Sequence, residues 1–189
     1  IPGNAAEIGR SAFSNCSRLS RVEICDGVES IGAYAFSGCT ALNYVDVPDS
    51  VTEIGAWAFY RCTGLVNIQL PSELEVLRDS VFSGCTELNA VGFPTGLREI
   101  GASAFRDCGE LTELIFPDSV RKIGASAFYG CVRLRAAQLP EALQSLGKWA
   151  FRGCSRLAEV RAGRSLMDIG DDVFLSTSAD LMIYGYAGS

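Results

Sequence analysis

The fold of this chain is decided by a 23-residue stretch, residues 48–70, which reads PDSVTEIGAWAFYRCTGLVNIQL. The stretch recurs along the 189 residues without an insertion from Pro2 to Gly185. One phenylalanine marks each copy, at Phe13, Phe36, Phe59, Phe82, Phe105, Phe128, Phe151 and Phe174. A fixed period of this length predicts a solenoid, in which each unit buries its apolar side chains against the next.

Other positions of the unit repeat in the same phase. Cysteine follows each of the first seven phenylalanines by three residues, and leucine follows each cysteine by three. The unit is P-x-x-V-x-x-I-G-x-x-A-F-x-x-C-x-x-L-x-x-V-x-L, and its eight copies are residues 2–24, 25–47, 48–70, 71–93, 94–116, 117–139, 140–162 and 163–185. We expect one solenoid domain over residues 1–189. Ile1-Pro2 is in phase with Val47-Pro48, in the middle of a repeat, so we also expect the chain to be a piece of a longer protein.

Each unit contains two predicted short strands and one predicted helical turn. The L-x-x-V-x-L segment alternates apolar and polar residues, so Val45 and Val47 are expected to face a core. The following proline ends this strand because it has no N–H. The V-x-x-I-G segment predicts a second strand on the opposite side, and its glycine permits a tight bend. The apolar groups of Ala-Phe-x-x-Cys at i, i+1 and i+4 predict one helical turn.

The second, fourth and eighth repeats depart from the unit, the eighth with Gly163, Thr177 and Asp180 at the proline, cysteine and leucine positions. In the fourth repeat Arg78 replaces the bend glycine and Val81 replaces the alanine, so we expect that coil to be locally altered. In the second repeat Cys25 stands where proline is expected, outside the cysteine column. Cys25 is therefore either an exposed thiol or simply a tolerated substitution.

The repeat resembles the BspA-like, or Treponema-type, subclass of leucine-rich repeats. The matching segments are IGAYAFSGCTAL at residues 31–42 and VPDSVTEIG at residues 47–55, and the resemblance extends over essentially the whole chain. It implies a mostly β repeat solenoid of the α/β type, a right-handed superhelix of eight coils with a parallel sheet on its concave face, short outer strands and helical turns. It also implies an adhesive or protein-binding role in secreted or cell-surface proteins, largely bacterial.

The cysteines are expected to be buried free thiols. Side chains in a ladder of equivalent positions run parallel to one another, which gives poor disulfide geometry even at a coil spacing of about 4.8 Å. Such thiols behave as small apolar groups. Zinc sites need clustered ligands such as paired C-x-x-C motifs, and the sequence contains no C-x-x-C, so we expect neither a metal nor another cofactor.

The composition argues against an enzyme and against nucleic-acid or membrane ligands. The chain has no histidine, which removes histidine-activated nucleophiles and histidine metal ligands together. Its net charge of −6, with basic residues spread among acidic ones, offers no surface for phosphate contacts. No apolar run of about 18 residues is present, so we expect no membrane insertion by this segment.

Variable positions on the constant scaffold are the expected recognition surfaces. The water-facing strand positions form the first candidate face, namely Tyr44, Asp46, Asn67, Gln69, Ala90, Glu113, Ile115 and Gln138. Their mixture of apolar and polar groups suits a protein or peptide ligand, although a merely solvent-tolerant face is the alternative. A second candidate is an outer aromatic patch of Tyr34, Trp57 and Tyr60, which either anchors a partner or covers the outer core.

These observations predict a non-enzymatic protein-binding or adhesion module of an extracellular or cell-surface protein. Its expected partner is a protein or peptide, with a host protein or a glycan among the candidates. The alternative function is a structural spacer that displays a neighbouring domain.

Overall fold

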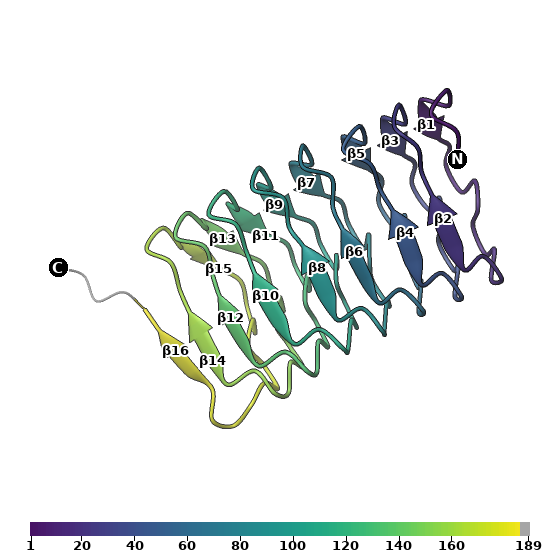
Figure 1. Ribbon diagram of the computed structural model, residues 1–189. Coiled ribbons are helices and arrows are strands. Elements are labelled where there is room, and N and C mark those ends of the chain that lie inside the picture. Colours follow the sequence, from purple (N-terminus) through teal and green to yellow (C-terminus); the bar gives the residue numbers. More distant parts are fainter. Residues whose placement is uncertain (186–189) are drawn as a thin grey trace.

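The protein is a solenoid of eight coils, each with one long and one short strand (Figure 1). The computed structural model describes residues 1–185, so the last four residues of the expected domain lie outside the described residues. The short strands are β1 (Glu7–Ile8), β3 (Ser30–Ile31), β5 (Glu53–Ile54), β7 (Val76–Leu77), β9 (Glu99–Ile100), β11 (Lys122–Ile123), β13 (Ser145–Leu146) and β15 (Asp168–Ile169). The long strands are β2 (Arg21–Glu23), β4 (Tyr44–Asp46), β6 (Asn67–Gln69), β8 (Ala90–Gly92), β10 (Glu113–Ile115), β12 (Ala136–Gln138), β14 (Glu159–Arg161) and β16 (Met182–Tyr184).

All strand pairs are parallel, and each residue pairs with its equivalent one coil away. Leu114 in β10, for example, is opposite Ala137 in β12, which is opposite Val160 in β14. The long strands form three sheets, β2-β4, β6-β8 and β10-β12-β14-β16, and the short strands form two, β1-β3-β5 and β7-β9-β11-β13-β15. The expected parallel solenoid of 23-residue coils is confirmed.

The predicted helical turn is wrong, and backbone conformation explains why. Two positions in every coil have a positive φ, which a right-handed helix cannot contain. The first is the outer column, namely Ser11, Tyr34, Trp57, Ser80, Ser103, Ser126, Trp149 and Asp172. The second lies just before the cysteine and is often glycine, as at Gly38 and Gly84. A non-glycine residue in this region costs about 1–2 kcal/mol, which glycine avoids.

Hydrogen bonds between coils compensate for this conformation. In the second coil the N–H groups of Ala35 and Ser37 donate within the turn, to the carbonyls of Gly32 and Tyr34. The alternating N–H groups of Tyr34 and Phe36 donate instead to the next coil, at 3.1 and 2.8 Å. The turn segment is therefore a third hydrogen-bonded side of the solenoid, which satisfies its buried backbone groups.

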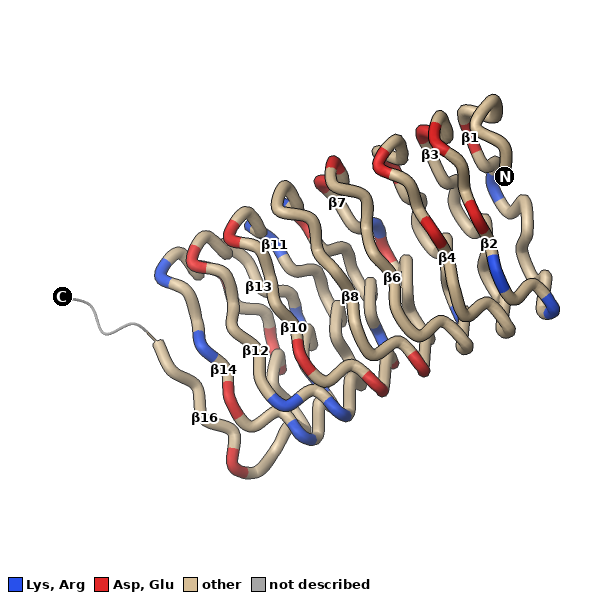
Figure 2. Tube along the Cα trace, in the orientation of Figure 1, with Lys and Arg blue, Asp and Glu red and all other residues tan. Residues whose placement is uncertain are grey.

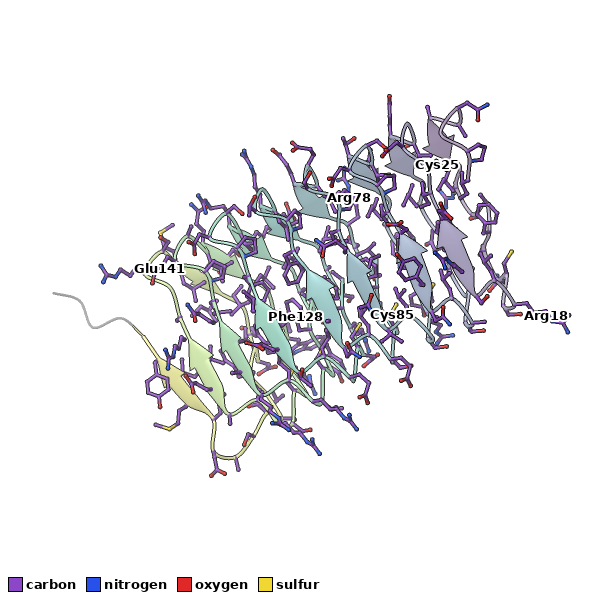
Figure 3. All side chains as sticks on the ribbon, viewed as in Figure 1. Arg18, Cys25, Arg78, Cys85, Phe128 and Glu141 are labelled. Atoms are coloured by element: carbon purple, nitrogen blue, oxygen red, sulfur yellow. The ribbon has the colours of Figure 1, made fainter. Side chains whose placement is uncertain are left out.

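The core consists of columns of equivalent side chains. Neighbouring phenylalanine rings of the column stack along the chain with centroids 5.3–5.8 Å apart. The six rings from Phe36 to Phe151 are fully buried, and Figure 3 shows Phe128 inside the stack. Each ring contacts a ring above and a ring below, which is why the stack buries a face that one unit cannot bury alone.

The fourth coil is altered, as its sequence predicts. Among residues 1–185 the short-strand sheet is divided between β5 and β7, next to Arg78. The bend glycines of other coils lie against the backbone of the preceding coil, and a Cβ on Gly124 would stand 2.6 Å from the nitrogen of Ala102. A side chain at this position therefore does not fit against a preceding coil at ordinary spacing. The Arg78 side chain points outward and forms an ion pair with Glu53 at 3.2 Å (Figure 3).

Candidate functional site

The first candidate face lies on the solvent side of the long strands. All eight predicted residues, Tyr44, Asp46, Asn67, Gln69, Ala90, Glu113, Ile115 and Gln138, are exposed, while the central residue of each of these long strands faces inward. Parallel pairing aligns the first positions in one row and the third positions in another. We call this surface the long-strand face.

Charge is unevenly placed along the long-strand face. Charged side chains occur on β2, β4, β10 and β14, whereas β6, β8 and β12 carry none (Figure 2). Near the N-terminal end Arg21 lies over the ring of Tyr44, with its guanidinium carbon 5.0 Å from the centroid. Near the other end Arg161 pairs with Glu159 at 2.7 Å. The charged strands are therefore interspersed with the uncharged strands β6, β8 and β12, and the face ends at the uncharged strand β16.

The eight predicted residues do not form one site. Glu113, Ile115 and Gln138 come together with Glu159 and Arg161 in a hollow of about 340 Å³ across β10, β12 and β14, which we call the long-strand hollow. Asp46 and Gln69 line a separate depression of about 570 Å³ that continues to Phe93 and Pro94. Tyr44, Asn67 and Ala90 line neither of these two hollows.

The long-strand hollow combines one apolar side chain with several charges. Ile115 is 75% exposed and lies on β10, the edge strand of the four-stranded sheet. The surrounding charged residues are Glu113, Asp118, Glu141 and Glu159 against a single arginine, Arg161. Sequence reasoning did not name Asp118 or Glu141, and it placed Glu159 and Arg161 on the water-facing side of a strand without including them in the candidate site. The 23-residue register was the available signal for Arg161, because it pairs directly with Gln138.

The outer aromatic patch is a stacked pair beside a groove. The rings of Tyr34 and Trp57 are parallel within 3°, with centroids 5.1 Å apart, and both are partly buried. Together with Tyr60 they line a depression of about 540 Å³, the outer groove, whose other residues are Arg61, Ser80, Ser83, Gly84, Ser103, Arg106 and Asp107. All three predicted patch residues are therefore brought together.

The core does not need these aromatic rings as a cover. Coils four to six carry Ser80, Ser103 and Ser126 at the position of Trp57, yet their phenylalanines are buried as completely as Phe59. A serine in the outer column is thus sufficient to keep water from the phenylalanine column.

The cysteine column is confirmed as buried, with one exception. Six cysteines from Cys39 to Cys154 are buried free thiols, and each donates a hydrogen bond to a phenylalanine carbonyl of the preceding coil at 3.1–3.3 Å. Figure 3 shows Cys85 within the coils. Cys16 occupies the same column but is exposed, because no described coil precedes it. Cys25 is also an exposed free thiol.

Burial raises the pKa of five thiols of the column and so favours their protonated form. It raises the pKa of Cys62 from its ordinary 9.0 to about 12, because the thiolate would lose its hydration. The same cause raises the pKa values of Cys39, Cys85, Cys108 and Cys131. A neutral buried thiol is neither a good nucleophile nor a metal ligand, so the column is structural.

Within the described residues the chain offers no metal centre and no membrane-spanning helix. Histidine is absent, and no group of three cysteine, aspartate or glutamate side chains is placed to hold an ion in residues 1–185. The same part of the chain contains no helix with the length and apolarity needed to cross a bilayer.

Fold and surface together define a leucine-rich-repeat solenoid, and the comparisons give its family. The family model of the BspA type leucine rich repeat region matches residues 6–135 and 76–184, so the chain belongs to that family. A comparison with curated proteins found no match.

Solved structures of bacterial leucine-rich-repeat proteins are similar to this chain. A Bacteroides ovatus leucine-rich repeat protein is 31% identical with a TM-score of 0.78, over 87% of this chain and 47% of that one. The Treponema pallidum leucine-rich repeat protein is also 31% identical, with a TM-score of 0.63, over 93% and 71%. A leucine-rich cell surface protein of Faecalibacterium prausnitzii is 29% identical with a TM-score of 0.73, over 99% and 60%. The chain thus spans between 47% and 71% of the length of these relatives.

Proposed function

We propose that this chain is a non-enzymatic protein-binding module of a secreted or cell-surface protein, and that the long-strand hollow receives a peptide segment of its ligand. The observation that carries the proposal is Ile115, a large apolar side chain that is 75% exposed beside a concave surface. A buried apolar anchor with a polar rim is the usual arrangement of an interface centre. The Faecalibacterium relative, a cell surface protein, supports the location.

The charges of the hollow favour a basic segment. Four carboxylates, on Glu113, Asp118, Glu141 and Glu159, surround one guanidinium, on Arg161. Potentials across an interface are usually complementary, so a ligand with an apolar residue between lysines or arginines fits best. Glu159 pairs with Arg161, and Glu141 accepts a hydrogen bond from the Arg164 N–H. Such a ligand would therefore place its apolar side chain on Ile115 and its cations at Glu113 and Asp118.

A peptide array probed with the purified chain tests this proposal. The array contains short peptides with a central leucine or phenylalanine flanked by lysine and arginine, and matched peptides flanked by glutamate. We expect the basic set to bind, and Ile115→Ser to weaken the affinity by about tenfold or more because the anchor loses its apolar contact. Fluorescence anisotropy with the best peptide measures the change.

Val132→Ser is the matched control, since Val132 is also an exposed apolar residue but lies outside the hollow. The Val132→Ser variant should bind the best peptide with the affinity of the wild type. Absence of any peptide binding, or equal binding by the Ile115→Ser variant, would contradict the proposal. Either result would favour the alternative of a structural spacer, which needs no ligand on this face.

A further inference from the structure

The outer groove is a second concave surface, on the turn side of the coils. Its wall is Trp57, and Tyr60, Ser80 and Ser103 continue it across the next coils. None of these residues belongs to the long-strand hollow. A ligand bound in the outer groove would therefore be independent of the proposed peptide ligand.

Trp57 lines the groove, and among the described residues one face of its ring carries no stacked ring or cation. Its other face is covered by Tyr34, which stacks on it with nearly parallel planes. The next residue of the outer column is Ser80, whose side chain is too small to cover a ring. The indole therefore presents a flat apolar surface along the stack, at the end of a row of serines.

Folding alone does not explain an aromatic ring at this position. Trp57 has φ of 58° and Tyr34 has φ of 60°, a conformation that bulky side chains rarely adopt. Serine fills the same position in three successive coils without any loss of core burial. Packing does not require aromatic residues in this unfavourable backbone conformation, so their presence points to a ligand contact.

The polar groups of the groove are available and predominantly cationic. Among the described residues the hydroxyls of Ser80 and Ser103 make no side-chain hydrogen bond, and Arg61 forms no ion pair. Arg61 lies over the ring of Tyr60, with its guanidinium carbon 5.3 Å from the centroid. Arg106 is paired with Asp107 at 3.3 Å. The groove thus holds two guanidinium groups and one carboxylate, although the whole chain has a net charge of −6.

We propose that the outer groove binds a carboxylate-bearing sugar. The apolar face of a pyranose ring would stack on the open face of Trp57, since sugar C–H groups pack on aromatic rings. The hydroxyls of Ser80 and Ser103 would hydrogen-bond sugar hydroxyls, and Arg61 would bind the carboxylate through charge-assisted hydrogen bonds. A sugar is favoured over an aromatic side chain of a protein because a pyranose carries several hydroxyls on one rigid ring, which matches the two serine hydroxyls beside the indole.

Titration calorimetry with defined sugars tests the site on the whole chain. The probes are sialyllactose and trigalacturonic acid, which carry carboxylates of two different sources, and lactose as the neutral counterpart. We expect at least one acidic probe to bind about tenfold or more tightly than lactose, because the carboxylate contact to Arg61 is lost with the neutral sugar. The two acidic probes distinguish a sialic acid from a uronic acid.

Two variants test whether the sugar binds in the outer groove, and a third is a control outside it. Trp57→Ser introduces the residue of the next three coils, and Arg61→Gln removes the charge; each should weaken acidic-sugar binding by about tenfold. Trp149→Ser makes the same change in the outer column outside the groove and should bind as the wild type does. Thermal unfolding confirms that all three variants are folded. Failure of both acidic probes, equal binding of lactose, or unchanged binding by Trp57→Ser would overturn the proposal.

Discussion

The phenylalanine column and the outer column lie two residues apart in every coil, yet they follow opposite rules. The first is phenylalanine in all eight coils, whereas the second contains serine, tyrosine, tryptophan and aspartate. A phenylalanine is enclosed by a ring on either side, so its size is dictated by its neighbours. An outer-column residue must only adopt a positive φ. The fold is thus specified by one column, and the adjacent column is free to carry recognition.

The largest loss of stability is expected for a substitution in the buried phenylalanine column. Phe105→Ala removes a fully buried ring that stacks on Phe82 and Phe128 and should lower the free energy of unfolding by about 3–5 kcal/mol. Ser103→Ala, two residues away in the outer column, should change it by no more than about 0.5 kcal/mol. Urea denaturation followed by circular dichroism measures both. Similar losses at the two positions would refute the division between the columns.

A smaller loss is expected where two coils touch through backbone alone. Gly124→Ala places a Cβ 2.6 Å from the nitrogen of Ala102, so the coils must separate, at a cost of about 1–3 kcal/mol. Gly96→Ala is the matched control, because a Cβ there meets no atom within 4 Å. The control should be neutral or slightly stabilising, since alanine restricts the unfolded chain. The same urea titration should show a loss only for Gly124→Ala.

The smallest effect per residue concerns the thiols. Burial raises the pKa of Cys62 to about 12, whereas an unfolded thiol ionises near 9.0. The stability contributed by the neutral buried thiol is therefore complete below pH 9 and is lost as the pH rises toward 12. One unit above the unfolded pKa the loss is roughly 1.4 kcal/mol for such a thiol.

The free energy of unfolding should therefore decline when it is measured from about pH 8 to about pH 10, because the unfolded thiols ionise over this range and the buried ones do not. Cys62→Ala should make the decline shallower, whereas Cys25→Ala, which removes an exposed thiol, should leave it unchanged. A steeper decline in Cys62→Ala than in the wild type would count against the buried thiols as its source. Thiol labelling of the native chain should reach Cys16 and Cys25 and spare the six buried cysteines until unfolding.

The residue pattern alone predicts the parallel solenoid and the inward-facing residues, and its departure at Arg78 predicts the altered fourth coil. These features follow from a strict period, because stacking identical units brings equal positions into contact. The eight residues of the long-strand face were placed correctly on the solvent side for the same reason. Alternation along a strand depends only on local geometry, which the residue pattern reports directly.

The conformation of the turns and the grouping of the candidate-site residues are visible only in the folded structure. The apolar spacing of Ala-Phe-x-x-Cys is equally compatible with a helical turn and with the observed turns at positive φ, and the hydrogen bonds between coils select the latter. The grouping of Ile115 with Arg161, and of Trp57 with Ser80 and Arg61, depends on which side chains of different coils meet around a hollow. A period places residues in columns, but the shape between columns arises from packing in three dimensions.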